Sequence, residues 1–311
     1  MKIIITGALG HIGSFLIQQF SHQFAGSQIV LIDDLSTQRY CSLFNLPQTA
    51  HYTFIESKVQ SLDLDSLIPG SDAIVHLAAT TDAAGTANQP DLVHQNNFES
   101  TKCLAEACMR HKIPLIFPSS TSVYGSQEAL VDEDCPDLVP QSPYAMCKIK
   151  EEEYLKELFS KGLKGIICRL GTIYGTSPGM RFHTAVNKFC WQAVMQQPIT
   201  VWETAIDQKR PYLALEDCGK AIGWIIQQAL YDGNVYNIVT GNHTVRDVLN
   251  VIRNHIAEIN ISYVPHKIMN QLSYEVSAQR FKNKGFAFTG SLHQGIADTI
   301  SLLKNATQIR T

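Results

Sequence analysis

The first twenty residues, MKIIITGALGHIGSFLIQQF, join a short β-branched run to three evenly spaced glycines and an apolar segment with helical spacing. Lys2 to Thr6 predicts a strand, Gly7, Gly10 and Gly13 predict a tight turn, and the residues after Gly13 predict a helix. Glycines in such a turn let backbone N–H groups approach a pyrophosphate at the positive end of the helix. The Gly-x-x-Gly-x-x-Gly spacing is a weak signal alone, because a glycine turn can also serve helix packing only.

The second predicted strand supports a nucleotide site. Gln28 to Ile32 is rich in branched apolar residues, and Asp33 follows it, twenty residues after Gly13. A carboxylate at this point of a dinucleotide-binding unit accepts hydrogen bonds from the adenosine ribose and would repel the 2′-phosphate of NADP. Asp33 could also be an ordinary loop acid, but together with the glycine turn it indicates NAD.

Strands and helices continue to alternate along the chain. The pattern predicts strands at 52–55, 73–77 and 114–117 and a helix at 97–109. Such alternation predicts an α/β fold with a doubly wound parallel (Rossmann) sheet, whose ligand site lies at the carboxyl ends of its strands.

The sequence predicts two parts of the chain, one for the cofactor and one mainly for the substrate. Residues 1–169 would form the NAD-binding domain with the catalytic groups. Residues 170–311 would form mainly a smaller C-terminal substrate-binding lobe, interleaved with the last strands of the sheet. Within this lobe Asp217 is expected to cap a helix from Cys218 to Tyr231.

Three residues that could handle a proton lie between 116 and 148. Ser120 follows the predicted 114–117 strand, and Tyr144 and Lys148 are four residues apart, on one face of a helix that Pro143 can begin. A phenol is a poor base at neutral pH, but a neighbouring cation favours its ionised form. These residues predict an acid/base site. For Tyr144 and Lys148 alone, two surface residues of an amphipathic helix would be the simpler interpretation.

The composition excludes several classes of protein. The chain has 311 residues, 45% of them apolar, and a formal net charge of −3, which lacks the basic footprint of a nucleic-acid-binding protein. Its eight cysteines form no Cys-x-x-Cys pair, so no metal site is predicted. With no signal peptide and no apolar run long enough for a bilayer, we expect a soluble cytoplasmic protein that does not bind membranes.

Several segments together resemble the extended short-chain dehydrogenase/reductase family, in particular its NAD-dependent nucleotide-sugar epimerases and dehydratases. They are TGALGHIG, HLAA, Asn97 in NNFEST, SSTSVYG, SPYAMCK, CRLGTIYG, KRPYLALEDCGKAI and VYNIVTGNHTVRDVL. In order and spacing they cover essentially the whole chain. The resemblance implies a Rossmann fold, bound NAD, a nucleotide-sugar substrate, and a homodimer formed by the helices around 101–109 and 144–159.

The resemblance also assigns roles to residues. Tyr144 would be the catalytic base, Lys148 would lower its pKa and hold the nicotinamide ribose, and Ser120 would hydrogen-bond the sugar oxygen that is oxidised. The other residues it assigns to the cofactor are Gly7, Gly10, His11, Ile12, Gly13, Asp33, Asp34, Leu77, Ala78, Ala79, Asn97 and Ser119. The other residues it assigns to the substrate are Thr81, Thr121, Thr172, Arg181, His183 and Arg210.

Some of these assignments have alternatives. Arg210 is the best candidate for a diphosphate, because a guanidinium pairs with phosphate oxygens in a planar fork. Arg181 could instead form a surface salt bridge, and His183 could instead begin a helix.

Several positions depart from the family pattern. Thr121 and Ser122 stand where nucleotide-sugar dehydratases carry acids, and neither hydroxyl can serve as a general acid at neutral pH, which makes 4,6-dehydration an unfavoured reaction. Lys58 stands where an Asp usually accepts from the adenine amino group, and an ammonium cannot accept that bond. Thr172 replaces a substrate-side Asn, and Cys147 replaces a Ser beside the lysine.

The sequence therefore predicts an NAD-dependent enzyme that oxidises a nucleotide-sugar hydroxyl, at C4 in the leading hypothesis. An epimerase would return the hydride to the other face of the ketosugar. A net dehydrogenase or ketoreductase would use the same residues and remains an open alternative. A non-catalytic dinucleotide-binding protein is the third hypothesis, which the intact Ser120, Tyr144 and Lys148 weigh against.

Overall fold

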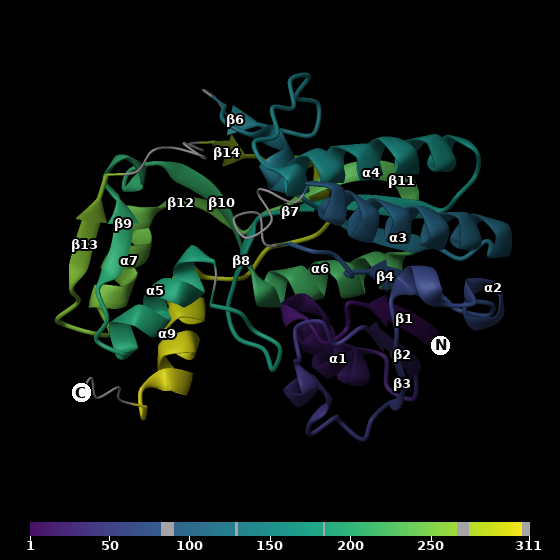
Figure 1. Cartoon of the computed structure of the whole chain (residues 1–311), viewed down its shortest axis with the longest axis horizontal. Coiled ribbons are helices and arrows are strands. Elements are labelled where there is room, and N and C mark those ends of the chain that lie inside the picture. Colours follow the sequence, from purple (N-terminus) through teal and green to yellow (C-terminus); the bar gives the residue numbers. More distant parts are fainter. Residues whose placement is uncertain (82–89, 128–129, 183, 266–273, 307–311) are drawn as a thin grey trace.

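A seven-stranded parallel sheet forms the centre of the computed structural model, which describes residues 1–81, 90–127, 130–182, 184–265 and 274–306 (Figure 1). The strands lie in the order β11-β7-β5-β4-β1-β2-β3, and every neighbouring pair is parallel. This is the predicted α/β fold with a large parallel Rossmann-type sheet. The strands of the sheet are β1 (Lys2–Thr6), β2 (Gln28–Asp33), β3 (His51–Glu56), β4 (Ala73–His76), β5 (Leu115–Ser120), β7 (Gly165–Leu170) and β11 (Asp232–Ile238).

Helices cover both faces of the sheet because successive strand residues point to opposite sides. In β1, Ile3 and Ile5 pack with α1 (His11–Gln23) and α6 (Leu215–Gln228). The intervening Ile4 packs with α3 (Pro90–His111) and α4 (Pro143–Ser160). The sheet is therefore buried on both sides, as its nearly continuous apolar strands require.

A smaller lobe lies beside the sheet, at the left of Figure 1. Its core is formed by apolar residues of three helices and of the strands packed against them. Its helices are α5 (Ala185–Val194), α7 (Val245–Arg253) and α9 (Leu292–Leu303), and its strands are β8 (Thr172–Tyr174), β9 (Ile199–Trp202), β10 (Lys209–Ala214), β12 (Gly241–Thr244) and β13 (Ile261–Val264). From this lobe the chain returns to the main body through α6 and β11 (Figure 1). It returns again through α8 (Gln279–Lys282), whose Phe281 packs in the core beside the sheet.

Shorter elements complete the described chain. They are the helices α2 (Leu64–Leu67) and α8 (Gln279–Lys282), the paired strands β6 (Leu130–Val131) and β14 (Glu275–Val276), and the 3-10 turns η1 (Tyr40–Leu43), η2 (Val59–Ser61), η3 (Thr121–Tyr124) and η4 (Glu203–Ala205). No helix within the described ranges combines the length and the apolar character that a membrane span requires.

The prediction for Asp217 is wrong. Its helix α6 begins at Leu215, three residues earlier than expected, and Ala214 occupies the N-cap position. Asp217 is fully buried in the first turn, where its carboxylate accepts from the hydroxyl of Thr240 and from the backbone N–H groups of Thr289 and Gly290. It therefore anchors a distant loop of the chain instead of capping a helix.

Candidate active site

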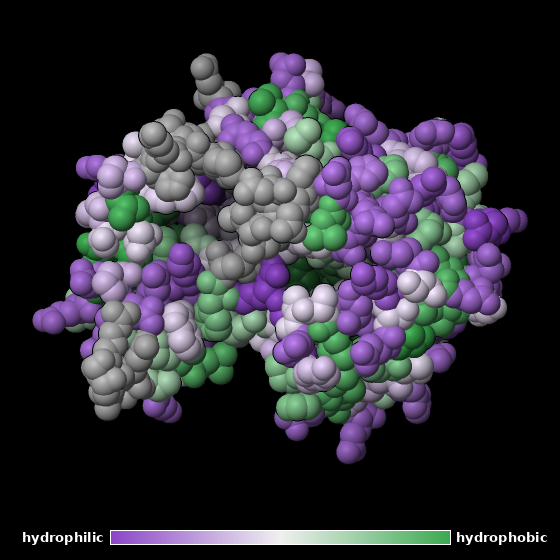
Figure 2. Space-filling model, in the orientation of Figure 1, coloured by the Kyte–Doolittle hydropathy of each residue, from purple (hydrophilic) through white to green (hydrophobic). Residues whose placement is uncertain are grey.

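A cavity of about 600 Å³ opens at the carboxyl ends of the central strands. Figure 2 shows a hollow near the middle of this face, with hydrophobic atoms at its depth. The cavity brings together most of the residues that the sequence predicted for the site. Those that line it are Gly7, Gly10, His11, Ile12, Gly13, Asp33, Asp34, Leu77, Ala78, Ala79, Thr81, Ser119, Ser120, Tyr144, Lys148 and Arg181.

The three glycines of the first turn have different physical roles. Gly7 has φ +63°, and a Cβ there would lie 2.6 Å from the backbone nitrogen of Ala78, so the close approach of β1 to β4 excludes a side chain. At Gly13 a Cβ would lie 2.5 Å from the carbonyl oxygen of Ala8, inside the turn itself. Gly10 precedes α1 and lines the cavity, where its missing side chain leaves the backbone open to a ligand.

The N-terminus of α1 is suited to a phosphate. This helix has thirteen residues, its first turn carries no acid, and no side chain caps it. Its first N–H groups and the positive end of its dipole therefore face the cavity beside Gly10. The turn fits the pyrophosphate of a dinucleotide.

Asp33 lies at the end of β2, beside the glycine turn. One carboxylate oxygen accepts from the backbone N–H of Leu9 at 3.0 Å and the other from Leu35 at 3.0 Å. Burial raises the pKa of Asp33, while these two hydrogen bonds lower it. The carboxylate is thus fixed in place and keeps further lone pairs for ribose hydroxyls.

Two cations that line the cavity near Asp33 were not assigned a role there. Arg39 lines it, and burial together with the nearby Arg181 lowers its pKa. Lys58 also lines it, as its unusual position in the sequence suggested. Arg39 lies in a loop without a periodic pattern. Only its short spacing from Asp33 in the sequence could have predicted it as a site residue.

The proposed acid/base residues meet at the carboxyl end of β5. Ser120 is the last residue of that strand, which ends three residues later than predicted, and its Oγ accepts from the backbone N–H of Ser122 at 3.2 Å. Its proton therefore remains available to donate. Tyr144 follows Pro143 at the start of α4, which Ser142 caps by accepting from the backbone N–H of Ala145.

Lys148 lies one turn further along α4 and is almost fully buried. Its ammonium is 4.3 Å from the centre of the Phe117 ring and 5.8 Å from that of Tyr144. Its carboxylate partner is Glu151, at 3.2 Å. Burial disfavours the charge of Lys148, but Glu151 and Tyr144 outweigh it, so that the pKa of Lys148 is raised.

The expected lowering of the Tyr144 pKa is opposed by the surroundings. Burial raises the pKa of the phenol, Lys148 lowers it, and Glu151 raises it again. A hydrogen bond with the Ser120 side chain contributes a smaller lowering. The net direction is upward, so that the phenol of the free protein holds its proton more firmly than an exposed tyrosine does.

A buried ion pair supports the strand that carries Ser119 and Ser120. The Arg169 guanidinium donates to the Glu152 carboxylate at 2.9 and 2.6 Å, and both side chains are at most 2% exposed. Glu152 also accepts from the hydroxyl of Ser119 at 2.6 Å, and Arg169 donates to the phenol of Tyr124. The site edge of β5 is thereby fixed to both α4 and β7.

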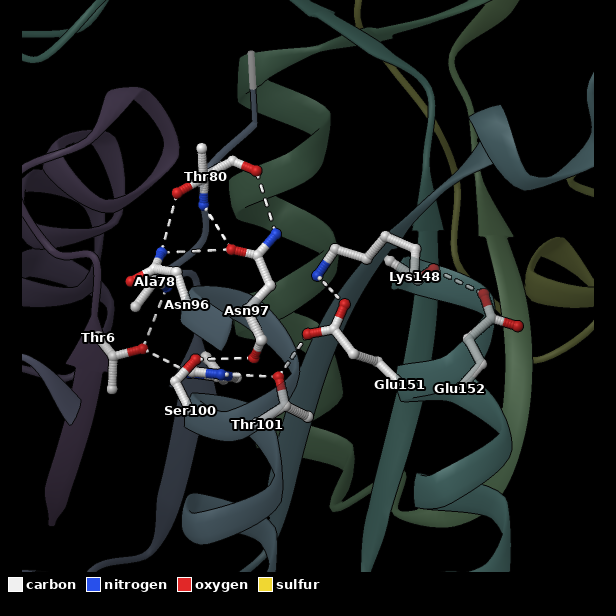
Figure 3. A network of polar contacts seen from close by, with 12 residues as sticks. Thr6, Ala78, Thr80, Asn96, Asn97, Ser100, Thr101, Lys148, Glu151 and Glu152 are labelled. Atoms are coloured by element: carbon white, nitrogen blue, oxygen red, sulfur yellow. Dashed lines mark hydrogen bonds and ion pairs between the residues drawn. The ribbon is translucent and has the colours of Figure 1, made fainter. Parts of the chain in front are cut away.

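Asn97 lies beside the cavity and does not line it. This side chain is fully buried and lies outside the residues that line the cavity. Its amide oxygen accepts from the backbone N–H of Thr80 at 2.7 Å, and its nitrogen donates to the Thr80 carbonyl (Figure 3). Asn96 and Ser100 line the cavity instead. Asn97 therefore holds the Thr80 backbone at the cavity wall, and its role toward the cofactor stays a prediction.

Three predicted substrate residues lie outside the cavity lining. Thr121 is buried with its hydroxyl 3.5 Å from the phenol oxygen of Tyr274. Thr172 belongs to β8, where its neighbour Ile173 reaches the cavity. Arg210 belongs to β10 and pairs in register with His243 of β12.

The remaining substrate predictions have different outcomes. Arg181 lines the cavity and donates to the hydroxyl of Thr81 at 2.5 Å. His183 lies outside the residues that the structure describes.

The loop at 175–181 contacts the glycine turn, which the sequence did not predict. His11 Nδ1 and Ser177 Oγ are 2.7 Å apart, and the backbone N–H of Gly179 donates to the Ser14 hydroxyl at 2.9 Å. A Cβ on Gly179 would overlap the carbonyl oxygen of Leu9. The loop that delivers Arg181 is therefore packed directly on the turn suited to a pyrophosphate.

Comparisons with known proteins agree with this geometry. Residues 3–239 match the family described as NAD dependent epimerase/dehydratase. The chain is 32% identical over 251 residues, 76% of both chains, to a Bacillus subtilis protein named uncharacterized UDP-glucose epimerase YtcB. It is 28% identical over 317 residues to a trifunctional Arabidopsis thaliana enzyme named for UDP-glucose 4,6-dehydratase, covering 96% of this chain and 46% of that longer one.

A solved structure shows the same fold. The UDP-glucuronic acid 4-epimerase of Bacillus cereus, in complex with UDP-glucuronic acid and NAD, is 25% identical and superposes with a TM-score of 0.84, covering 98% of this chain and 99% of that one. The family match spans the glycine turn, Asp33 and the Ser120, Tyr144 and Lys148 group, so this chain belongs to the NAD dependent epimerase/dehydratase family and is an NAD-dependent enzyme.

Proposed function

We propose that this enzyme is a nucleotide-sugar 4-epimerase. Its similarity to proteins named as epimerases and as dehydratases leaves the reaction to be argued from the site. The observation that carries the proposal is the convergence of Ser120, Tyr144 and Lys148 on one cavity, beside positions that hold no acid. These groups can move one proton at a carbinol, and the cofactor supplies the hydride acceptor and donor.

The roles follow from the contacts of each residue. Ser120 accepts from a backbone N–H, which leaves its own proton to donate to the sugar oxygen. Tyr144 takes the hydroxyl proton as the alcohol becomes a ketone and returns it on reduction. Lys148 stabilises the phenolate at the moment of transfer, because an adjacent cation favours the ionised phenol. In an epimerase the ketosugar turns over between these two events and is reduced on its other face.

The residues beside Ser120 favour epimerisation over dehydration. Elimination of water from C5 and C6 needs a general acid and a base next to the oxidised carbon. Thr121 is directed into the protein toward Tyr274, and Ser122 carries a buried hydroxyl. Neither can exchange a proton as a carboxyl group does at neutral pH.

The binding residues complete the proposal. Gly7, Gly10, Asp33 and the start of α1 would hold NAD, with the fit described above. Arg181 lies in the same cavity and would contact the diphosphate of the substrate, whereas Arg210 lies outside the cavity lining. Residues 170–311 would thus supply mainly the substrate side of the site.

A substrate screen tests this function. UDP-, GDP-, CDP- and dTDP-sugars would be supplied with NAD, while NADH is followed by absorbance and the sugar by NMR. We expect inversion at C4 of one sugar without accumulation of NADH. Stoichiometric NADH with a keto product would show a net dehydrogenase instead, and a product that has lost water would show a dehydratase.

We also propose a homodimer formed through α3 and α4. The two helices pack side by side, and each exposes a large apolar side chain near the start, Leu92 and Met146. Two such pairs would bury these side chains in a four-helix seam. Light scattering at micromolar concentration should give twice the 34.6 kDa mass of the chain, and a monomeric mass would contradict the seam.

A further inference from the structure

A buried carboxylate that the proposed chemistry does not use lies beside Lys148. Glu151 is 1% exposed and Lys148 is 3% exposed, and their charged groups are 3.2 Å apart on one face of α4. Burying such a pair is costly unless further hydrogen bonds satisfy the carboxylate. One such bond reaches Glu151 directly, from the Thr101 hydroxyl, and that hydroxyl is linked in turn to residues of β4 and β1.

A chain of hydrogen bonds leads from Glu151 across the sheet edge (Figure 3). The Thr101 hydroxyl of α3 donates to Glu151 at 2.5 Å, and His76 Nε2 of β4 lies 3.1 Å from that hydroxyl. His76 Nδ1 lies 2.7 Å from the hydroxyl of Thr6 in β1, and Thr6 accepts from the backbone N–H of Ala78. All the side chains of this chain are at most 3% exposed.

The carboxylate sets the direction of every bond in this chain. A carboxylate only accepts, so Thr101 must donate to it and must itself accept from His76 Nε2–H. His76 Nδ1 is then an acceptor for the Thr6 hydroxyl, and Thr6 accepts from Ala78. His76 is held as one neutral tautomer, which agrees with a pKa lowered to about 3 by burial and by Lys148. Glu151 is thus held between the Thr101 hydroxyl and the Lys148 ammonium.

The same carboxylate competes with the Tyr144 phenolate for one cation. With Glu151 ionised, the buried pair of Glu151 and Lys148 is neutral, and removing the Tyr144 proton would leave a net negative charge in the site. Without the Glu151 charge, the phenolate would become the counter-ion of Lys148. Charges this close dominate the ionisation of a buried group.

We propose, on the basis of the function above, that Glu151 is a positioning residue that fixes the Lys148 ammonium and keeps Tyr144 in its protonated form until a further positive charge enters the cavity. Tyr144 is subject to ionisable groups from its own helix, to a hydroxyl of β5 and, through Lys148, to a histidine of β4. These groups are Lys148, Glu151, Cys147, Ser120 and His76.

The test is a titration of Tyr144 in the free protein, without NAD or substrate. Ultraviolet absorbance would follow phenolate formation over the pH range in which circular dichroism shows the fold, and the matching Tyr144→Phe protein would be subtracted each time. Glu151→Gln keeps the shape of the side chain and removes its charge. We expect the Tyr144 ionisation to move down by about one pH unit or more, at least tenfold in the ionisation constant.

Two further variants separate charge from structure. Thr101→Val removes the hydrogen bond to Glu151 but keeps the carboxylate, and it should leave the ionisation close to that of the parent. Glu151→Asp withdraws the charge from Lys148 and should give a smaller shift in the same direction as Glu151→Gln. If Glu151→Gln does not fold, the titration of Glu151→Asp takes its place.

Identical phenolate signals in the parent and the Glu151 variant, or an equal shift in Thr101→Val, would overturn the proposal and leave Glu151 a structural link between α4 and α3. Because the titration needs no turnover, a failed substrate screen would not affect its outcome.

Discussion

Gly179 of the small lobe touches the turn that begins α1: a side chain there would overlap the carbonyl oxygen of Leu9 and lie 2.7 Å from that of Gly10. The residues are far apart in sequence, yet their contact joins the loop that carries Arg181 to the turn suited to the NAD pyrophosphate. The two halves of the proposed site therefore share one packed surface.

Replacing Gly179 tests that surface. Gly179→Ala should push the 175–181 loop from the glycine turn and destabilise the protein by about 1–3 kcal/mol, as overpacking does. NAD affinity by calorimetry should fall together with the unfolding midpoint. Thr176→Ala is the control, because it lies in the same loop and adds no atoms. Unchanged NAD affinity in Gly179→Ala would show that the contact does not shape the cofactor turn.

Removing the Tyr144 hydroxyl should stop the chemistry and spare binding. In Tyr144→Phe we expect turnover to fall by about 10²–10⁴-fold, because the group that moves the proton is lost. NAD affinity should stay close to that of the parent. Tyr52→Phe removes a phenol that donates to the carbonyl of Pro47, outside the cavity lining, and serves as the control. Full turnover in Tyr144→Phe would end the proposed mechanism.

The Ser120 hydroxyl should matter for the rate more than for binding. Its proton is the one available to a developing negative charge on the sugar oxygen, and loss of such a donor costs roughly 10²-fold or more. Ser120→Ala should therefore lower kcat with little change in KM. Ser160→Ala, at the exposed end of α4, is the matched control. An equal loss in both variants would argue against a specific role.

The buried ion pair of Arg169 and Glu152 should be worth more than its exposed counterparts. Arg169→Met would leave the Glu152 carboxylate buried without its main partner, at a cost of about 3–5 kcal/mol in the free energy of unfolding. Arg110→Met, which breaks an exposed pair with Asp65, should cost far less because water screens those charges. Denaturant unfolding of both variants measures the contrast, and similar losses would contradict it.

His76 should make the protein less stable in acid. Its pKa lies near 3 in the folded protein, below the ordinary value of 6.5, so the unfolded chain binds a proton that the folded chain does not. The free energy of unfolding should therefore fall as the pH drops from 6.5 toward 3, by about 1.4 kcal/mol per pH unit from this group alone. His76→Gln should remove that part of the slope. Parallel stability curves for parent and variant would show that His76 is not involved.

Local patterns in the sequence determined the main elements. Short runs of branched apolar residues predicted β1 and β2, and the spacing of Pro143, Tyr144 and Lys148 predicted the start of α4 and the face it presents. These features depend on backbone geometry within a few residues, so that the sequence shows them directly. The glycine turn is another such local feature, because Gly7 adopts a positive φ that glycine favours.

The tertiary structure decided which polar groups face the cavity. Asn97 and Asn96 are neighbours, and only the packing of α3 against the Thr80 backbone directs the first inward and leaves the second at the cavity. Asp217 fits a cap by spacing, but its carboxylate accepts from the backbone N–H of Thr289, 72 residues later in the chain. Such outcomes depend on contacts between distant segments, which no local pattern encodes.

The pKa of Tyr144 also depends partly on the local sequence and partly on the fold. The sequence placed Lys148 one helical turn from Tyr144, and a neighbouring cation lowers the pKa of a phenol. Burial and Glu151 outweigh that effect in the folded chain and raise the pKa of Tyr144 instead. Spacing along a helix fixes which groups meet, whereas desolvation depends on everything packed around them, and only the fold supplies that.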